Sequence, residues 1–298
     1  MTTLAPPPPA PPVSPPAPPA SPPPLSPGGR TAIRALLIIA ATVIALGVVG
    51  TLGVVAWGLS SFRVITDSKP LPPQMRSLVI DTGRLPVAIR ITADQNVTAP
   101  RADLRMINNT QADPHPLAMT DDSTSARLTI SAEPSPFLQW GRAGEITVVL
   151  PPQLARRLTV TSQQETGALM AQADLDQITA RMTHGAVLLS GSARRIELHG
   201  VDGPVVSQTP ISVSEQFSAD IANGDITVDF TDAPRTLDAT TDNGDVRIAL
   251  PPRGPYVVNA SGGGATAVRV PQTSDRSEAA ALVTARSGSG DVRVDESR

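Results

Sequence analysis

Residues 240–252 read "TTDNGDVRIALPP", and the same succession of a polar residue, Gly-Asp and alternating apolar positions returns in "IANGDITVDF" at 221–230 and in "SGSGDVRVDE" at 287–296. An adjacent Gly and Asp can belong to a metal-binding loop, to the acid pair of an enzyme or to a backbone turn. Because the motif recurs within one chain, it favours a repeated structural unit.

A glycine returns about every 20 residues through the C-terminal half of the chain. Seven such glycines, with spacings of 18, 18, 21, 20, 20 and 26, are Gly167, Gly185, Gly203, Gly224, Gly244, Gly264 and Gly290. The residue seven positions before each of them is apolar, the last two being Val257 and Val283, and mostly apolar residues follow at two and four positions after it. A period of two is typical of half-buried strands. Each unit is therefore predicted to be a strand, a glycine turn and a second strand.

These units predict an all-β domain over residues 77–296, built as a β-solenoid of about seven repeats of ~20 residues. A sandwich of β-hairpins gives the same spacing and stays open as the alternative. Strands are also predicted in "SLVIDTGRLPVAIRI" (77–91), "ARLTISA" (126–132) and "EITVVLPP" (145–152), which are expected to begin the same sheet system. The polar stretch within 92–124 is predicted to be a loop.

Three segments precede this domain. Residues 1–32 hold 14 prolines and are predicted to be a disordered, extended tail, with a docking motif for an aromatic-lined partner domain as the alternative. Residues 33–60 contain an uncharged apolar run longer than the ~20 residues that a helix needs to span a bilayer, so a transmembrane helix is predicted and a cleavable signal peptide is disfavoured. Residues 61–76 are predicted to be a short stalk.

The predicted helix makes the lipid bilayer a partner and the chain a single-pass protein of the cell membrane. No acidic residue precedes it, and long C-terminal domains cross the membrane largely regardless of their charge. We therefore expect a cytoplasmic N-terminus and an extracytoplasmic domain. The net charge of -3 gives no electrostatic case for nucleic acid, and the absence of cysteine removes disulfides and thiolate chemistry.

The segments "EITVVLPP", "ANGDITVDF", "GDVRIALPP" and "SGSGDVRV" resemble the bacterial "putative adhesin" domain of unknown function, which is built from β-strand repeats and is related to toastrack domains of envelope-stress systems. The resemblance covers residues 77–296. The basic residues are Arg except for Lys69, which suits a high-GC genome and an actinobacterial or mycobacterial type of that domain. The resemblance implies a membrane-tethered or exported β-repeat protein, and the family has no established catalytic residue.

Several short motifs are similar to catalytic or ligand-binding motifs. Asp81, Thr82 and Gly83 match the triplet of aspartic proteases, but that chemistry needs a second carboxylate, and Arg84 follows where a small residue is expected. "SGGGATAV" at 261–268 lacks the Lys and the helix of a phosphate loop and is predicted to be a tight corner. The three histidines have no metal-ligand spacing and are predicted to be ordinary surface or turn residues: His115, His184 and His199.

The acidic turns are the strongest remaining candidates. Asp225, Asp245 and Asp291 are weak candidates for calcium if successive units bring them together, although each turn offers few ligands. The favoured hypothesis is that Asn-Gly provides tight turns, with the Asp as a solvated cap. Asp174, Asp176 and Glu165 form the tightest acidic group near a predicted unit, and their spacing demands no catalysis.

The expected function is non-enzymatic and needs no cofactor: display of a β-repeat scaffold, adhesion or interaction domain in the cell envelope, with a protein or an envelope polymer as partner. The alternative is an envelope-stress or signalling component whose proline-rich tail recruits a cytoplasmic partner. A third class, a hydrolase of envelope polymers, requires clustered carboxylates in a groove.

Overall fold

The computed structural model describes residues 62–109, 113–131 and 144–297. These residues form 19 strands and the four-residue helix α2 (Pro152–Ala155), which confirms the prediction of an all-β domain. The predicted tail at 1–32 and the predicted transmembrane helix at 33–60 lie outside the described residues. Within the described part, no helix has the length and apolar character required to cross a membrane.

The strands fall into two groups along the chain. Before α2 they are β1 (Phe62–Pro70), β2 (Ser77–Gly83), β3 (Val87–Ala93), β4 (Arg101–Asn109), β5 (Leu117–Asp121), β6 (Ser125–Ile130) and β7 (Gly144–Leu150). After it they are β8 (Thr159–Gln172), β9 (Leu175–Ser190), β10 (Ser192–Asp202), β11 (Val205–Ser207), β12 (Ile211–Asn223), β13 (Ile226–Asp232), β14 (Thr236–Asn243), β15 (Val246–Leu250), β16 (Tyr256–Gly262), β17 (Thr266–Arg269), β18 (Ala281–Ser287) and β19 (Val292–Glu296).

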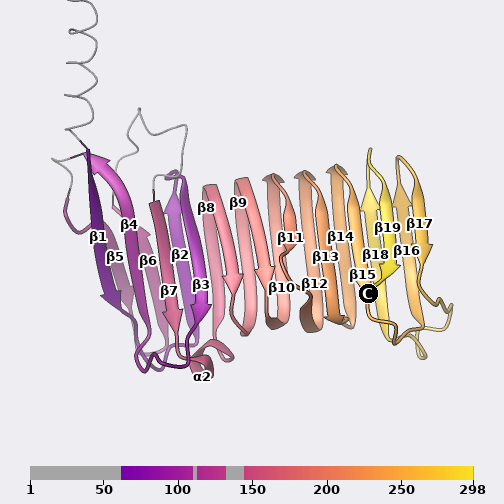
Figure 1. The fold of residues 1–298 in the computed structure, drawn as a ribbon, viewed down its shortest axis with the longest axis horizontal. Coiled ribbons are helices and arrows are strands. Elements are labelled where there is room, and N and C mark those ends of the chain that lie inside the picture. The colour runs from indigo at the N-terminus through magenta and orange to yellow at the C-terminus, as the bar shows by residue number, and fades with distance from the viewer. Residues whose placement is uncertain (1–61, 110–112, 132–143, 298) are drawn as a thin grey trace, which may run out of the picture. The chain divides into compact units, whose positions relative to one another are not determined.

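The strands stack in two parallel ladders (Figure 1). The first ladder runs β6, β2, β8, β9, β10, β12, β14, β18 and β16, and the second runs β7, β3, β8, β9, β11, β13, β15, β19 and β17. The long strands β8 and β9 serve both ladders, with the part before their glycine in the first and the part after it in the second. Every pairing recorded from β8 to β19 is parallel, so the alternative of β-hairpins is wrong for this region.

The register of the ladders follows the glycine spacing. Thr159 lies opposite Gln177, Gln177 opposite Arg195, Arg195 opposite Gln216 and Gln216 opposite Thr236. Apart from a shift between Ala193 and Arg195 where β10 meets β12, one register holds along each of these pairings, so most buried apolar residues of one unit stack on apolar residues of the next. The interior is therefore made of columns of like side chains.

The columns form the core. One of them consists of Val160, Ile178, Ile196, Phe217, Leu237 and Val283, all at most 3% exposed. Phe217 meets Phe230 of the opposite ladder edge to face, with ring centroids 5.4 Å apart. The expected position of Val257 in this column is wrong, because its neighbour Val258 lies opposite Val283 while Val257 is half-buried.

At both ends of the ladders, the order in space differs from the order in the chain. β18 and β19 lie between β14–β15 and the outermost strands β16 and β17, so that they fill a place that the chain has passed over. Likewise β2 and β3 lie between β6–β7 and β8. Four residues lie between Ser287 and Val292, as four lie between Thr241 and Val246 in the unit on which they stack. The corner between β18 and β19 therefore has the same length as the corner between β14 and β15, which allows β18 and β19 to stack directly on these two strands.

Two expectations for the N-terminal part are wrong. Most of the predicted stalk at 61–76 is strand β1, antiparallel to β4, and the following Leu71 and Met75 are buried. Part of the polar stretch "NNTQADPHPLAMTDDSTS", which was predicted to be a loop within 92–124, is also strand, because β5 lies within it; β4, most of which precedes that stretch, was not predicted. In "RADLRMINN" the alternate residues Ala102, Leu104 and Met106 are at most 3% exposed, so β4 itself has the period of two of a half-buried strand.

The seven predicted turn glycines lie in one column at the corner between the ladders. A Cβ atom on Gly203 would overlap the carbonyl oxygen of Gly185, and the same overlap recurs from Gly224 to Gly203 and from Gly244 to Gly224. Gly203 also has φ +136, in a region that side chains disfavour. In this column Gly290 follows Gly244 and Gly264 comes last, in line with the order of the outer strands.

Gly203→Ala tests the close approach in this column. Gly83→Ala is the matched control, because Gly83 has φ +55 but no atom within 4 Å of its added Cβ. We expect the control to lose about 1–2 kcal/mol of unfolding free energy from backbone strain alone, and Gly203→Ala to lose more than about 4 kcal/mol. Equal shifts of the urea midpoint for the two variants would show that the stacked carbonyl does not demand glycine.

Candidate functional site

The aspartates that follow the corner glycines form a chain of hydrogen bonds from unit to unit. The backbone N–H of Asp245 donates to Oδ1 of Asp225 at 2.8 Å, and the N–H of Asp291 donates to Oδ1 of Asp245 at 2.9 Å. The N–H of Ala265 then donates to Oδ1 of Asp291 at 2.8 Å. Each carboxylate therefore caps the corner of the next unit. From the sequence, each Asp was expected to cap only its own turn.

Arg247 supplies the counter-charge to this row. Its guanidinium pairs with Oδ2 of Asp245 and lies 3.9 Å from Oδ2 of Asp225. The N–H of Asp291, together with Arg247, holds the pKa of Asp245 below its usual range. The three calcium candidates are thus brought into one row, where their Oδ1 atoms accept backbone hydrogen bonds. In the described residues, no group of three or more His, Cys, Asp or Glu side chains is arranged to hold a metal ion.

A second polar column lies beside the aspartates. Asn243 donates from Nδ2 to Oδ1 of Asn223 at 2.9 Å, and Asn223 donates to Oδ1 of Asp202 at 2.7 Å. His184 Nδ1 lies 2.8 Å from Oδ2 of Asp202, and Ser289 extends the column at the other end by donating to Asn243. Because an amide can donate and accept at once, the exposed corner forms a continuous hydrogen-bonded edge.

A shallow groove of about 940 Å³ runs beside this edge, across the outer side of the first ladder from β2 to β14. Along it lies one row of residues in register, in which Asp81 is opposite Gln163, Gln163 opposite Arg181, Arg181 opposite His199 and His199 opposite Asp220. Neighbouring strands are about 4.8 Å apart, so the row presents polar groups at that interval.

The groove combines an apolar patch with charges of both signs. Val201 is 45% exposed within it. Two of its carboxylates already have basic neighbours, because Arg127 lies 3.5 Å from Asp81 and Arg84 lies 3.3 Å from Glu165.

Two other acidic residues of the groove, Asp220 and Asp242, have no ion-pair partner among the described residues, and neither has the exposed Arg181. The free carboxylates lie on β12 and β14, at one end of the groove. The groove therefore offers unneutralised charge on an open surface.

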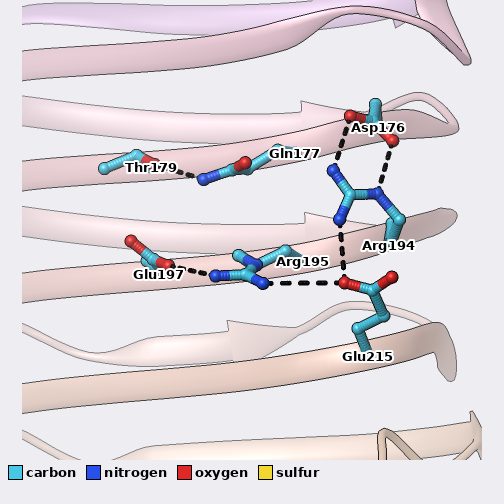
Figure 2. A network of polar contacts seen from close by, with 7 residues as sticks. All are labelled: Asp176, Gln177, Thr179, Arg194, Arg195, Glu197 and Glu215. Carbon is cyan, nitrogen blue, oxygen red and sulfur yellow. Dashed lines mark hydrogen bonds and ion pairs between the residues drawn. The ribbon is translucent and has the colours of Figure 1, made fainter.

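The opposite end of the same strands carries an ion-pair network (Figure 2). Arg194 holds both oxygens of Asp176 at 2.9 and 3.0 Å and reaches Glu215 at 2.8 Å. Arg195 bridges Glu215 and Glu197 at 3.6 and 3.5 Å. The hydrogen bonds from Arg194 hold the pKa of Asp176 below its usual range and raise the pKa of Arg194. The network joins three neighbouring strands of the first ladder, and each of its charged groups has a partner of opposite sign.

The acidic group noted in the sequence is divided among three places. Asp176 lies in the network, while Asp174 accepts from the backbone N–H of Ser192 at 3.1 Å and lies 3.7 Å from Arg156. Glu165 lies in the groove, two residues before Gly167 of β8. The three carboxylates are therefore not gathered into one cluster.

The other motifs lie in turns and on the surface. Asp81 accepts from the backbone N–H of Gly83 at 3.1 Å, so the protease-like triplet forms the turn that ends β2. "SGGGATAV" at 261–268 is the corner between β16 and β17. The histidines are in separate places, with His115 3.5 Å from Asp67, His184 beside Asp202 and His199 in the groove.

Sequence analysis missed the groove row. Its residues are separated by 18 to 82 positions in the chain, and only the strand register brings them together. Gln163, Arg181 and His199 are spaced by 18 residues, as are the first three corner glycines. This equal spacing was the signal in the sequence that could have predicted the row. The position of Asp81 was not accessible in this way, because β2 is inserted outside the chain order.

Comparisons with known proteins give structural neighbours only. No family model and no curated protein matches the chain. A "putative cell adhesion protein" from Clostridium sporogenes is 11% identical with a TM-score of 0.37, and the match covers 79% of this chain and 100% of that one.

Two further solved structures are similar at the same level. A "putative lipid binding protein" from Parabacteroides distasonis is 10% identical with a TM-score of 0.44, covering 77% of this chain and 96% of that one. A "putative adhesin" from Bacteroides fragilis is 13% identical with a TM-score of 0.34, covering 78% and 97%.

The depressed pKa of Asp245 predicts an acid-sensitive corner. Stability from this carboxylate is complete above its unfolded pKa of about 3.9 and is lost as the pH falls through the lower folded value. We expect Asp245→Asn to lower the urea midpoint near neutral pH, and its difference from the parent chain to shrink in acid. Asp220→Asn, which removes an exposed carboxylate without a recorded partner, is the control and should show no such convergence.

A double-mutant cycle tests the ion-pair network. Asp176→Ala and Arg194→Ala should show a measurable coupling in unfolding free energy, because the pair is bidentate. Asp232 and Arg253 form the matched control, with a single 3.7 Å contact and side chains 57% and 81% exposed. We expect almost no coupling for the control pair, and equal couplings would contradict a structural role for Arg194.

Proposed function

We propose that the chain is a non-enzymatic, single-pass membrane protein whose residues 77–296 form a β-solenoid displayed outside the cytoplasmic membrane as an interaction module. The observation that carries the proposal is the groove beside the glycine corner. It crosses consecutive strands, is open to solvent and contains an exposed Val201 between charged residues. Such a surface suits contact with an extended partner.

The charges of the groove indicate the chemistry of that partner. Asp81 and Glu165 have basic neighbours, whereas Asp220 and Asp242 do not. A partner that places basic side chains over β12 and β14 would neutralise these two carboxylates. We therefore propose an extended polypeptide with basic residues as the partner, and an uncharged envelope polymer is the competing outcome.

The display topology supports this function on sequence grounds. Residues 35–59 form an uncharged apolar run before the domain, and no acid precedes it. In cells with a permeabilised outer layer, added protease should degrade the domain at 77–296 while an epitope at the N-terminus stays protected. A protected domain would contradict the proposed topology and with it the function.

Peptide binding to the full chain in detergent micelles tests the groove. A fluorescent peptide of alternating Lys and Ser should bind more tightly than one of alternating Glu and Ser, and added salt should weaken it. Asp220→Asn with Asp242→Asn should weaken binding roughly two- to tenfold. Asp232→Asn with Asp238→Asn removes two carboxylates outside the groove and is the control. Equal weakening by both pairs would show that net charge, and not the groove, attracts the peptide.

A further inference from the structure

The two ladders end together at β16 and β17 (Figure 1). Among the described residues, β17 is paired only with β19, and β16 is paired only with β18 apart from a single bridge between Tyr256 and Gln272. The other sides of Val257–Gly262 and of β17 therefore present unpaired backbone N–H and C=O groups. Such an edge is a template for another strand.

The edge of β16 lacks the features that prevent pairing. Its sequence, "YVVNASG", contains no charged residue and no proline. At the opposite end of the ladders, β1 includes Asp67 and Lys69 and ends in Pro70, and β5 is only five residues long and ends in Asp121. Charges, proline and short length are the usual protections of an edge strand. The β16 edge thus lacks these protections, whereas β17 beside it is four residues long and ends in Arg269.

The interior is also incompletely covered at this end. Val258, Ala260 and Val268 pack on the core but stay partly exposed, whereas their counterparts in the next unit, Val283, Ala285 and Val294, are at most 2% exposed. A further layer of strands would bury them. An occupant of this end therefore gains apolar contact as well as backbone hydrogen bonds.

We propose that this end is an interface for a second copy of the chain, joined through β16 and β17. A partner peptide can pair with one edge, but two edges end here, one in each ladder. The second copy presents the same two edges at the same separation. A two-fold axis that runs through both ladders places β16 antiparallel to its own copy and β17 antiparallel to its own copy.

The absence of charge on the β16 edge is compatible with this two-fold symmetry. In a two-fold pair each residue meets a symmetry-related one, so a charged edge would face its own charge. The free part of β16, Val257–Gly262, is neutral. A pair centred on Asn259 would set Asn259 opposite its own copy and Val257 opposite Ser261 of the second copy.

Cysteine cross-linking of the full chain in detergent micelles tests the interface. The chain has no cysteine, so a single introduced one can cross-link only to another copy. Asn259→Cys should shift most of the chain to twice the monomer mass on oxidation in a non-reducing gel. Asp238→Cys is the matched control, because Asp238 is also exposed and lies in the same row as Asn259, two strands further in across Thr284. The control should stay monomeric.

Two results with these cysteine variants would contradict the proposed interface. The proposal is overturned if Asn259→Cys gives no cross-link, which is also the result expected when another protein or another segment of the chain covers the edge. It is equally overturned if Asp238→Cys cross-links to the same extent. Sedimentation of the unaltered chain gives a check that does not depend on the cysteine variant. A dimer is expected, and a monomer at all concentrations would overturn the interface.

Charge placement tests the antiparallel register. In the Asn259→Cys chain, Val257→Lys with Ser261→Lys sets like charges opposite each other and should abolish the cross-link. Val257→Lys with Ser261→Glu sets opposite charges together and should restore it. Failure to restore, with both variants folded by circular dichroism, would contradict this register. Binding of the Lys peptide in the groove should be unchanged in both, so this inference and the proposed function can fail separately.

Discussion

The close approach of backbones at the glycine corner is the constraint on which the rest of this structure depends. The carbonyl oxygen of one corner glycine occupies the space that a Cβ on the next would need, from Gly185 to Gly203 and onward. This contact fixes the residue at which each unit turns from one ladder into the other. Once the turn is fixed, the register of both adjoining strands follows, and with it the columns of apolar side chains inside and of polar side chains outside.

The same stacking determines the chemistry of the exterior. Because side chains of successive units are neighbours, a carboxylate at one corner meets the backbone of the next, as Asp225 meets the N–H of Asp245. Charges at the corner and in the network of Arg194 are satisfied within the stack. The groove is different, since Asp220 and Asp242 have no such partner, and the terminal edge at β16 is different in a second way, since its backbone is unpaired. The groove and the β16 edge, where polar groups lack partners within the stack, are therefore the places where another molecule can bind.

The sequence predicted the features that repeat. Gly167 to Gly244 share both the spacing and the need for glycine, and a period of two marked the buried positions around them. What it could not predict depends on contacts between distant segments. Nothing in the spacing shows that β18 and β19 lie inside β16 and β17, because Gly264 and Gly290 both satisfy the pattern. β4 is different, because Ala102, Leu104 and Met106 alternate with Asp103 and Arg105, so the sequence did contain the signal for that strand. The row from Asp81 to Asp220 needed the register of all intervening strands.

The displaced order of the outer strands limits how such a chain can change in length. Between β8 and β15 each unit stacks on the one that precedes it in the chain, so a whole unit gained or lost there leaves both neighbours in place. After Leu250 the last strands in the sequence are interior strands in space. A chain shortened from its C-terminus would lose β18 and β19 and leave β16 and β17 separated from the stack by a gap. Growth by duplication is therefore compatible with the middle of the domain and opposed at its ends, which stay the same whatever the number of units between them.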